Sequence, residues 1–248
     1  MQTGKVLKTN VSLGSYEEIL DQICDLAKTS TSSYVCFANV HMLIEAYDNP
    51  AFCDVVNEAD VVAADGRPLS VMLRLTQGIH QQRVCGMDIL PDLLRRAENR
   101  DLSVFFYGSS DDVLQRISAR ISHELPHLKV AGLYSPPFRE LSESEEQSVV
   151  EHINGSGANL VFVALGCPKQ EKWMAAHKGK INACMLGLGQ AFNVYGGIEK
   201  RLPPWMRNLS MEWMYRLYLE PKRLWKRYLH GNSKFIALAV RQFAGRLS

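Results

Sequence analysis

The sequence has no long apolar run, and none of its windows approaches the roughly 18 apolar residues that a membrane-spanning helix needs. Its opening stretch, MQTGKVLKTNVSLGS, also lacks the apolar region of a secretory signal peptide. The six cysteines are scattered, without a CxxC pair or the Cys/His spacing of a zinc site. We therefore expect a cytoplasmic protein whose thiols are reduced and mostly buried.

Several nucleotide-binding signatures are also missing. There is no GxGxxG fingerprint, and Gly187-Leu188-Gly189 lacks the third glycine and the helical pattern that should follow. No Walker A lysine loop is present, and no Asp-x-Asp pair is available to hold Mg²⁺ on a sugar nucleotide. These absences disfavour a dinucleotide-dependent dehydrogenase, and we expect neither a metal site nor a cofactor.

Charge is distributed unevenly along the chain. Residues 200–248 carry eleven Lys and Arg against two acidic residues, a net charge of +9, whereas residues 1–199 carry a net charge of −7. Tryptophan and tyrosine are interspersed with the basic residues of this last part. We predict two regions: a body over residues 1–195 and a basic, aromatic-rich helical appendage over 196–248, whose partner is anionic.

In the body, apolar β-branched runs alternate with amphipathic stretches, two of which begin with capping boxes. This alternation predicts an α/β fold, a Rossmann-like and mostly parallel sheet with helices on both faces. The expected strands are Val6–Val11, Tyr34–Phe37, Val61–Ala64, Ser103–Tyr107, Lys129–Leu133, Leu160–Leu165 and Ala183–Leu188. The expected helices are Ser15–Lys28, Met42–Tyr47, Ile89–Ala97, Asp111–His123 with a serine cap, and Ser142–Ile153.

The stretch NLVFVALGCPKQEKW, residues 159–173, is the most informative part of the body. A buried strand is followed by a tight turn, with Pro168 where a helix would begin. Polar side chains at this position lie at the carboxyl end of a strand, where open α/β sheets bind ligands, and the helix start favours an anion such as a diphosphate. The alternative is an ordinary connecting loop with solvated charges. The candidate binding residues here are Gly166, Pro168, Lys169, Gln170 and Glu171.

Polar or glycine-containing turns follow other expected strands as well. In a parallel sheet these turns share one edge and can converge on one ligand. The further candidates are Asn39, Asp65, Gly108, Ser109 and Gln190. Asp65 is a lone carboxylate at the end of an apolar strand. It is either a turn-forming or helix-capping residue or a general base that accepts a proton from an attacking hydroxyl.

The basic segment is expected to form short helices, Glu212–Tyr218 and Pro221–Tyr228, after the break at Pro203-Pro204. On a continuous helix the spacing of Arg216, Arg223 and Arg227 would place them on one face. Three interpretations compete: a docked helical cap, a nucleic-acid surface, and a membrane-interface segment. The acidic body argues against nucleic acid.

Two groups of residues resemble the WecB/TagA/CpsF glycosyltransferases, glycosyltransferase family 26. The first is GxPKQExW at residues 166–173. The second is a long motif that runs from Gly189-Gln190-Ala191-Phe192-Asn193 through Met211-Glu212-Trp213-Met214-Tyr215-Arg216 to Arg227-Tyr228. Ala64-Asp65-Gly66 and Arg83-x-x-Gly86-x-Asp88 match as well. The resemblance covers about residues 10–230.

This resemblance implies an inverting, metal-independent enzyme that transfers a sugar from a UDP-sugar to a sugar on undecaprenyl diphosphate, at the inner face of the plasma membrane. It assigns the base to Asp65, a nucleotide-side contact to Gln170, and C-terminal arginine contacts to Arg216, a second catalytic residue, and to Arg223 and Arg227. Arg83 joins the substrate-binding residues. Two positions depart from the family pattern: Phe37 stands where many members have threonine, and Asn193 where aspartate is usual.

The expected partners are therefore a UDP-sugar, a polyprenyl-diphosphate-linked acceptor and the anionic membrane surface, with a homo-oligomer as a further option. Arginine forks can bind diphosphate oxygens without a metal ion. The competing hypothesis is a Rossmann-like binding module without catalytic activity that docks on anionic lipid.

Overall fold

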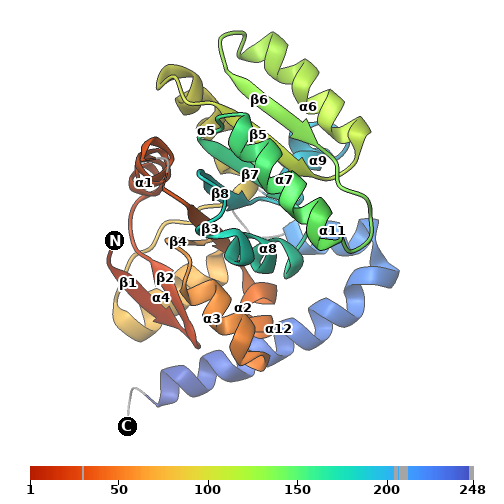
Figure 1. Ribbon diagram of the computed structural model, residues 1–248. Coiled ribbons are helices and arrows are strands. Elements are labelled where there is room, and N and C mark those ends of the chain that lie inside the picture. Colours follow the sequence, from red (N-terminus) through yellow and green to blue (C-terminus); the bar gives the residue numbers. More distant parts are fainter. Residues whose placement is uncertain (30, 204–205, 207–211, 246–248) are drawn as a thin grey trace.

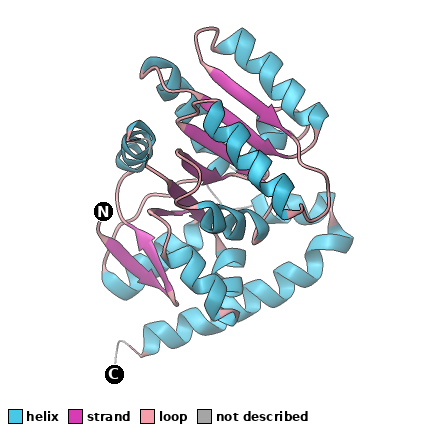
Figure 2. Cartoon of the chain, viewed as in Figure 1, coloured by secondary structure: helices cyan, strands magenta, loops and turns pink. Residues whose placement is uncertain are grey.

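The computed structural model describes residues 1–29, 31–203, 206 and 212–245 (Figure 1). Its centre is a six-stranded sheet in which every pairing is parallel, in the order β4-β3-β8-β7-β5-β6. Helices flank the sheet on both faces (Figure 2). The α/β, Rossmann-like prediction is therefore confirmed. The strands of this sheet are β3 (Ser33–Ala38), β4 (Val61–Ala64), β5 (Val104–Gly108), β6 (Val130–Tyr134), β7 (Leu160–Ala164) and β8 (Cys184–Gly187).

Two apolar cores lie on the two faces of the sheet. Successive strand residues point to opposite faces, so neighbours in one strand belong to different cores: Phe106 packs in the first, Phe105 and Tyr107 in the second. The first core is covered by α1 (Tyr16–Lys28), α5 (Gly86–Asn99), α6 (Asp111–Glu124) and α9 (Ala191–Tyr195). The second is covered by α2 (Val40–Asp48), α3 (Pro50–Asn57), α4 (Arg67–Gln77), α7 (Glu143–Gly155) and α8 (Lys169–His177).

Local sequence signals account for most helix starts. Ser15 and Ser142 form complete capping boxes with Glu18 and Glu145. Ser110 occupies the N-cap position of α6, as predicted, although its side chain makes no capping hydrogen bond. Helices α3, α4 and α9 had no counterpart among the expected elements.

The first expected strand, Val6–Val11, is wrong. The chain reverses at Leu7, whose φ is 55°, and forms an antiparallel hairpin of β1 (Thr3–Val6) and β2 (Thr9–Ser12). The apolar residues Val6 and Val11 are both buried, one on each strand. Apolar residues on either side of a turn thus looked like one continuous run.

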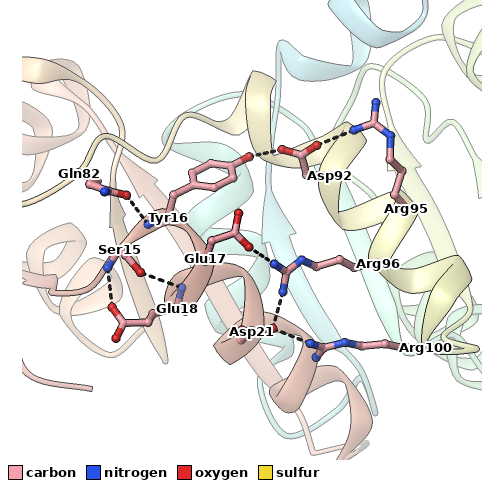
Figure 3. A network of polar contacts seen from close by, with 10 residues as sticks. All are labelled: Ser15, Tyr16, Glu17, Glu18, Asp21, Gln82, Asp92, Arg95, Arg96 and Arg100. Atoms are coloured by element: carbon pink, nitrogen blue, oxygen red, sulfur yellow. Dashed lines mark hydrogen bonds and ion pairs between the residues drawn. The ribbon is translucent and has the colours of Figure 1, made fainter.

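Helices α1 and α5 are joined by the polar network in Figure 3. The two guanidiniums of Arg96 and Arg100 share the carboxylate of Asp21, and the Tyr16 hydroxyl donates to Asp92 at 2.7 Å. Burial is the main reason that the pKa of Tyr16 lies well above its ordinary value, and the hydrogen bond to Asp92 raises this pKa further. The network fixes α5 against α1, and thereby the segment that leads into α5.

The C-terminal segment contains α11 (Glu212–Leu219) and α12 (Pro221–Ala244). The second helix has 24 residues, so the expectation of a short helix ending near Tyr228 is wrong. It runs along α2 and α4, where Phe235 is 6% exposed and belongs to the second core (Figure 1). Near its end, Gln242 accepts a hydrogen bond from the Leu7 N–H at 2.9 Å.

Candidate active site

A cavity of about 370 Å³ lies at the carboxyl ends of β3 and β4. One wall comes from the residues after these two strands, including the first residues of α2 and α4, and from the segment that leads into α5. The other wall comes from α11 and α12. Its lining residues are Asn39, Val40, His41, Asp65, Gly66, Arg67, Pro68, Arg83, Met87, Trp213, Tyr228, Gly231, Asn232, Phe235 and Ile236. Three predicted site residues, Asn39, Asp65 and Arg83, therefore share one cavity.

Asp65 is positioned by the sheet itself. Ala38 and Ala64 are paired in the parallel register, and the Asp65 N–H donates to the Ala38 carbonyl at 2.8 Å. The residue at the N-cap of α4 is Gly66, with φ of 132° and no side-chain capping bond. The N-cap position of α4 is therefore held by Gly66, and Asp65 lies one residue before it, directly after β4.

Asn39 both builds the fold and lines the cavity. Its Oδ1 accepts a hydrogen bond from the Met42 N–H at 3.2 Å and so caps α2. The cap fixes the side chain at the strand end beside Asp65. His41 and Arg67, two positions after Asn39 and Asp65, line the same cavity but were not among the predicted site residues. The rule that ligands bind beyond strand ends could have identified them.

Arg83 reaches the cavity from the segment between α4 and α5. The Val84 N–H donates to the Ala64 carbonyl at 2.8 Å, which ties this segment to the end of β4. Nη2 of Arg83 lies 3.1 Å from Oδ2 of Asp88, and Oδ1 of the same carboxylate accepts from Arg201. One carboxylate thus contacts two guanidiniums, and the Arg83 side chain lines the cavity.

The C-terminal helices close the other side of the cavity. Trp213 of α11 and Tyr228 of α12 meet edge to face, with ring centroids 5.9 Å apart, and both line the cavity. Phe235 and Ile236 continue this wall. Aromatic and aliphatic groups thus face the carboxylate and arginine side. Such a surface suits a sugar or lipid portion of a substrate better than a second charged group.

The second group of predicted residues lies at neighbouring strand ends, outside the described lining of this cavity. Gly108 has φ of 105°, and a side chain there would meet the Ala164 carbonyl, so the turn after β5 lies directly against β7. The Ser109 N–H donates to that carbonyl at 3.0 Å. Gly166, with φ of 80°, begins the turn after β7. These glycines allow the turns to approach one another closely.

Pro168 is the N-cap residue of α8, not its first helical residue, and follows a cis peptide bond. Lys169 is exposed at the first position of α8. Gln170 is buried: its Oε1 accepts from the Gly166 N–H at 3.2 Å, and its Nε2 donates to Oε1 of Glu171 at 2.8 Å. A side chain on Gly187 would collide with the Gln170 amide. Gln170 thus joins the turns after β7 and β8.

Glu171 is fully buried, and burial raises the pKa of its carboxyl group, with the Gln170 amide acting in the opposite direction. Gln190, in the turn after β8, donates to Glu199, which also accepts from Nδ2 of Asn193 at 2.9 Å. The asparagine that departs from the family pattern therefore binds a carboxylate, as an aspartate there would not.

The backbone of Arg216 lies in α11, and those of Arg223 and Arg227 lie in α12. Their side chains are outside the described part of the structure, so their assignment to the substrate stays a prediction. Among the described residues, no group of three or more His, Cys, Asp or Glu is arranged to hold a metal ion. The described part also contains no helix that is both long and apolar enough to cross a membrane.

Chemically, the cavity combines a carboxylate at a strand end, an arginine, and an aromatic wall. A carboxylate can accept a proton from a hydroxyl nucleophile, and a guanidinium can stabilise a phosphate leaving group. This combination is suited to transferring a group from a phosphorylated donor to a hydroxyl acceptor.

Comparison with known proteins agrees with this chemistry. The family model described as the glycosyl transferase WecG/TagA/CpsF family matches residues 4–248. A Bacillus subtilis (strain 168) protein named N-acetylglucosaminyldiphosphoundecaprenol N-acetyl-beta-D-mannosaminyltransferase is 35% identical over 192 residues, 77% of this chain and 73% of the relative. Proteins of the same name from Bacillus spizizenii (strain ATCC 23059 / NRRL B-14472 / W23) and Staphylococcus aureus (strain NCTC 8325 / PS 47) are 32% and 27% identical. The match with the B. spizizenii protein covers 79% of this chain and 75% of the relative. The match with the S. aureus protein covers 80% of this chain and 77% of the relative.

The resemblance drawn from the PKQE stretch and the C-terminal motif is thereby confirmed over nearly the whole chain. With its carboxylate, its arginine and its aromatic wall in one cavity, this chain is a glycosyltransferase and belongs to the WecG/TagA/CpsF family.

Proposed function

We propose that this protein transfers a hexose or N-acetylhexosamine from a UDP-sugar to a sugar carried on undecaprenyl diphosphate, with inversion and without a metal ion. The product would belong to bacterial surface polysaccharide synthesis: a capsule, exopolysaccharide, teichoic acid or common antigen. The names of the relatives favour N-acetylmannosamine as the transferred sugar and an N-acetylglucosamine-bearing lipid diphosphate as the acceptor.

The observation that carries the proposal is the meeting of Asp65, Asn39 and Arg83 in one cavity, at the carboxyl ends of two neighbouring parallel strands. Ligands of open parallel sheets bind at this edge. The cavity volume of about 370 Å³ is within the range of small-molecule sites.

In the proposed reaction, the acceptor hydroxyl attacks the anomeric carbon of the donor while its bond to the UDP oxygen breaks. Asp65 takes the hydroxyl proton, and UDP leaves with the electron pair of the broken bond. Attack from the face opposite UDP inverts the anomeric centre. Arg83, together with Arg216, Arg223 and Arg227, would stabilise the negative charge on the diphosphate.

A lipid-linked acceptor requires the enzyme to work at the inner face of the plasma membrane. On α12, Leu229, Ile236 and Val240 are 65%, 62% and 63% exposed, and their spacing of seven and four residues puts them on one helix face. Val71 and Leu75 of the neighbouring α4 are also about half exposed. An apolar strip of this kind marks an interaction surface.

Ile236 is part of both features, since it belongs to the strip and also lines the cavity. A lipid-tethered sugar could therefore enter from the membrane side. We expect the exposed basic residues of this segment to face anionic lipid. Lys234 is an exception, because it pairs with Asp48 of α2. Arg241 and Lys222 are exposed.

The test is turnover of a panel of UDP-sugars, including UDP-N-acetylmannosamine, UDP-N-acetylglucosamine and UDP-glucose, on a short-chain polyprenyl-diphosphate N-acetylglucosamine acceptor. Release of UDP that depends on the acceptor, with a disaccharide product of inverted anomeric configuration, is the expected result. Binding to anionic vesicles without turnover of any donor would instead support the non-catalytic binding module.

A further inference from the structure

Asp88 connects two parts of the molecule that are far apart in the sequence. It lies in the first turn of α5, where its N–H donates to the Cys85 carbonyl at 3.0 Å. Its Oδ2 lies 3.1 Å from Nη2 of Arg83, and its Oδ1 accepts from Nη2 of Arg201, 113 residues further along the chain. One carboxylate thus holds both guanidiniums.

These ion pairs are partly shielded from water. The side chains of Arg83, Asp88 and Arg201 are 17%, 29% and 23% exposed. Charge-assisted hydrogen bonds are stronger than neutral ones, and reduced exposure weakens screening by salt. The group is therefore a better-defined connection than an exposed surface ion pair.

The two arginines have different surroundings. Arg83 lines the cavity and is attached to the end of β4 through the Val84 N–H. Arg201 precedes the C-terminal helices that form the opposite wall, and its Nη1 also lies 3.2 Å from the Met87 sulfur, another lining residue. A change at Asp88 would therefore act on both walls of the cavity.

We propose that Asp88 is a positioning residue: it orients Arg83 toward the substrate and, through Arg201, anchors the start of the C-terminal segment that closes the cavity. Asp88 does not line the described cavity and acts through the two arginines. The inference rests on the proposed function for its kinetic part, because Arg83 must contact substrate for its orientation to matter.

A double-mutant cycle on the full-length enzyme tests the action through Arg83. Asp88→Asn should lower kcat/KM about 10- to 100-fold, as expected for losing a hydrogen bond between charged groups, chiefly by raising KM. Arg83→Lys keeps the positive charge but removes the planar guanidinium. In this background, Asp88→Asn should lower kcat/KM less than about threefold. Equal factors in both backgrounds would show that Asp88 does not act through Arg83.

Asp92→Asn is the matched control, since Asp92 lies four residues further along α5 and pairs with Arg95 and Tyr16 away from the cavity. It should leave KM within about twofold of the wild-type value. A loss as large as that of Asp88→Asn would mean that any carboxylate removed from α5 damages the helix, and would overturn the inference.

The anchor is tested separately by hydrogen–deuterium exchange of residues 199–203. Asp88→Asn and Arg201→Gln should both speed exchange there, while Asp92→Asn should not. Unchanged exchange in both variants would overturn the anchoring role. This arm is independent of catalysis, so it remains decisive even if the wild-type enzyme turns over none of the UDP-sugars, an outcome that would reject the proposed function alone.

Discussion

Nε2 of Gln170 donates a 2.8 Å hydrogen bond to Oε1 of Glu171, and both side chains are buried next to the turns after β7 and β8. Two adjacent residues that the sequence predicts to bind a ligand thus form a buried connection within the protein. Gln170 holds Gly166 with its oxygen and Glu171 with its nitrogen, so the orientation of its amide is fixed at both ends.

Burial of Glu171 gives a prediction about stability and pH. Because burial raises the pKa of this carboxyl group above its ordinary value of 4.5, the folded state binds the proton more tightly than the unfolded state. Its contribution to stability is therefore present at low pH and is lost as the pH rises from 4.5 through the raised folded-state value. Glu171→Gln should remove this part of the decline, measured by urea unfolding between pH 4.5 and 8.

Glu145→Gln is the control, because the pKa of Glu145 is lowered in the folded protein whereas that of Glu171 is raised. The hydrogen bond with Arg139 lowers the pKa of Glu145 to about 2, so its contribution is present above pH 4.5 and is lost as the pH falls toward 2. If Glu171→Gln shows the same decline between pH 4.5 and 8 as the wild type, Glu171 is not the responsible group.

Asp65→Asn should remove the general base and keep the shape of the side chain. We expect kcat to fall about 10²- to 10⁴-fold, with UDP affinity nearly unchanged, since a base acts on the acceptor proton and not on the nucleotide. The measurements are steady-state turnover and calorimetric titration with UDP. Near-normal turnover by the folded variant would exclude Asp65 as the base.

Arg216→Ala should reduce turnover even with a soluble, short-chain acceptor. Arg216 comes three residues after Trp213 of α11, which lines the cavity. Loss of a charge-assisted contact to a diphosphate would lower kcat/KM about 10- to 100-fold. Lys222→Ala, at an exposed position of α12, is the control and should change only vesicle binding. Full activity of Arg216→Ala would limit the segment to membrane attachment.

Activity should persist in excess EDTA. The prediction comes from the missing Asp-x-Asp pair and from the arginines available for the diphosphate. It is checked by measuring turnover after dialysis against EDTA, with and without added Mg²⁺ or Mn²⁺. Activity that disappears on chelation and returns with either ion would contradict the arginine-only mechanism.

The apolar strip on α12 predicts that Leu229→Ser with Val240→Ser weakens binding to vesicles that contain anionic phospholipid, about tenfold or more, because two large exposed apolar groups are lost. Phe138→Ser is the matched control, as Phe138 is 93% exposed in the loop between β6 and α7. Cosedimentation at low and high salt separates the apolar contribution from the electrostatic one. Equal loss in the control would indicate nonspecific adsorption.

The sequence alone determined the fold class, most elements, the family and the three residues Asn39, Asp65 and Arg83 that meet in the cavity. These features depend on local signals: apolar runs, capping boxes, polar residues directly after strands, and a long contiguous motif. The hairpin at Leu7 and the full length of α12 were missed, because an apolar run does not mark its own turn and Pro221 is compatible with the first turn of a long helix.

The tertiary structure alone decided which polar residues face the cavity and which are internal. Gln170 and Glu171 are predicted from the sequence as substrate-binding residues of a turn, and the structure shows that both side chains are buried and hydrogen-bonded to each other. Arg83 and Arg201 are 118 positions apart in the sequence. Both contact Asp88 only because the C-terminal segment returns to α5. No local pattern encodes such long-range pairing; it depends on packing of the whole chain.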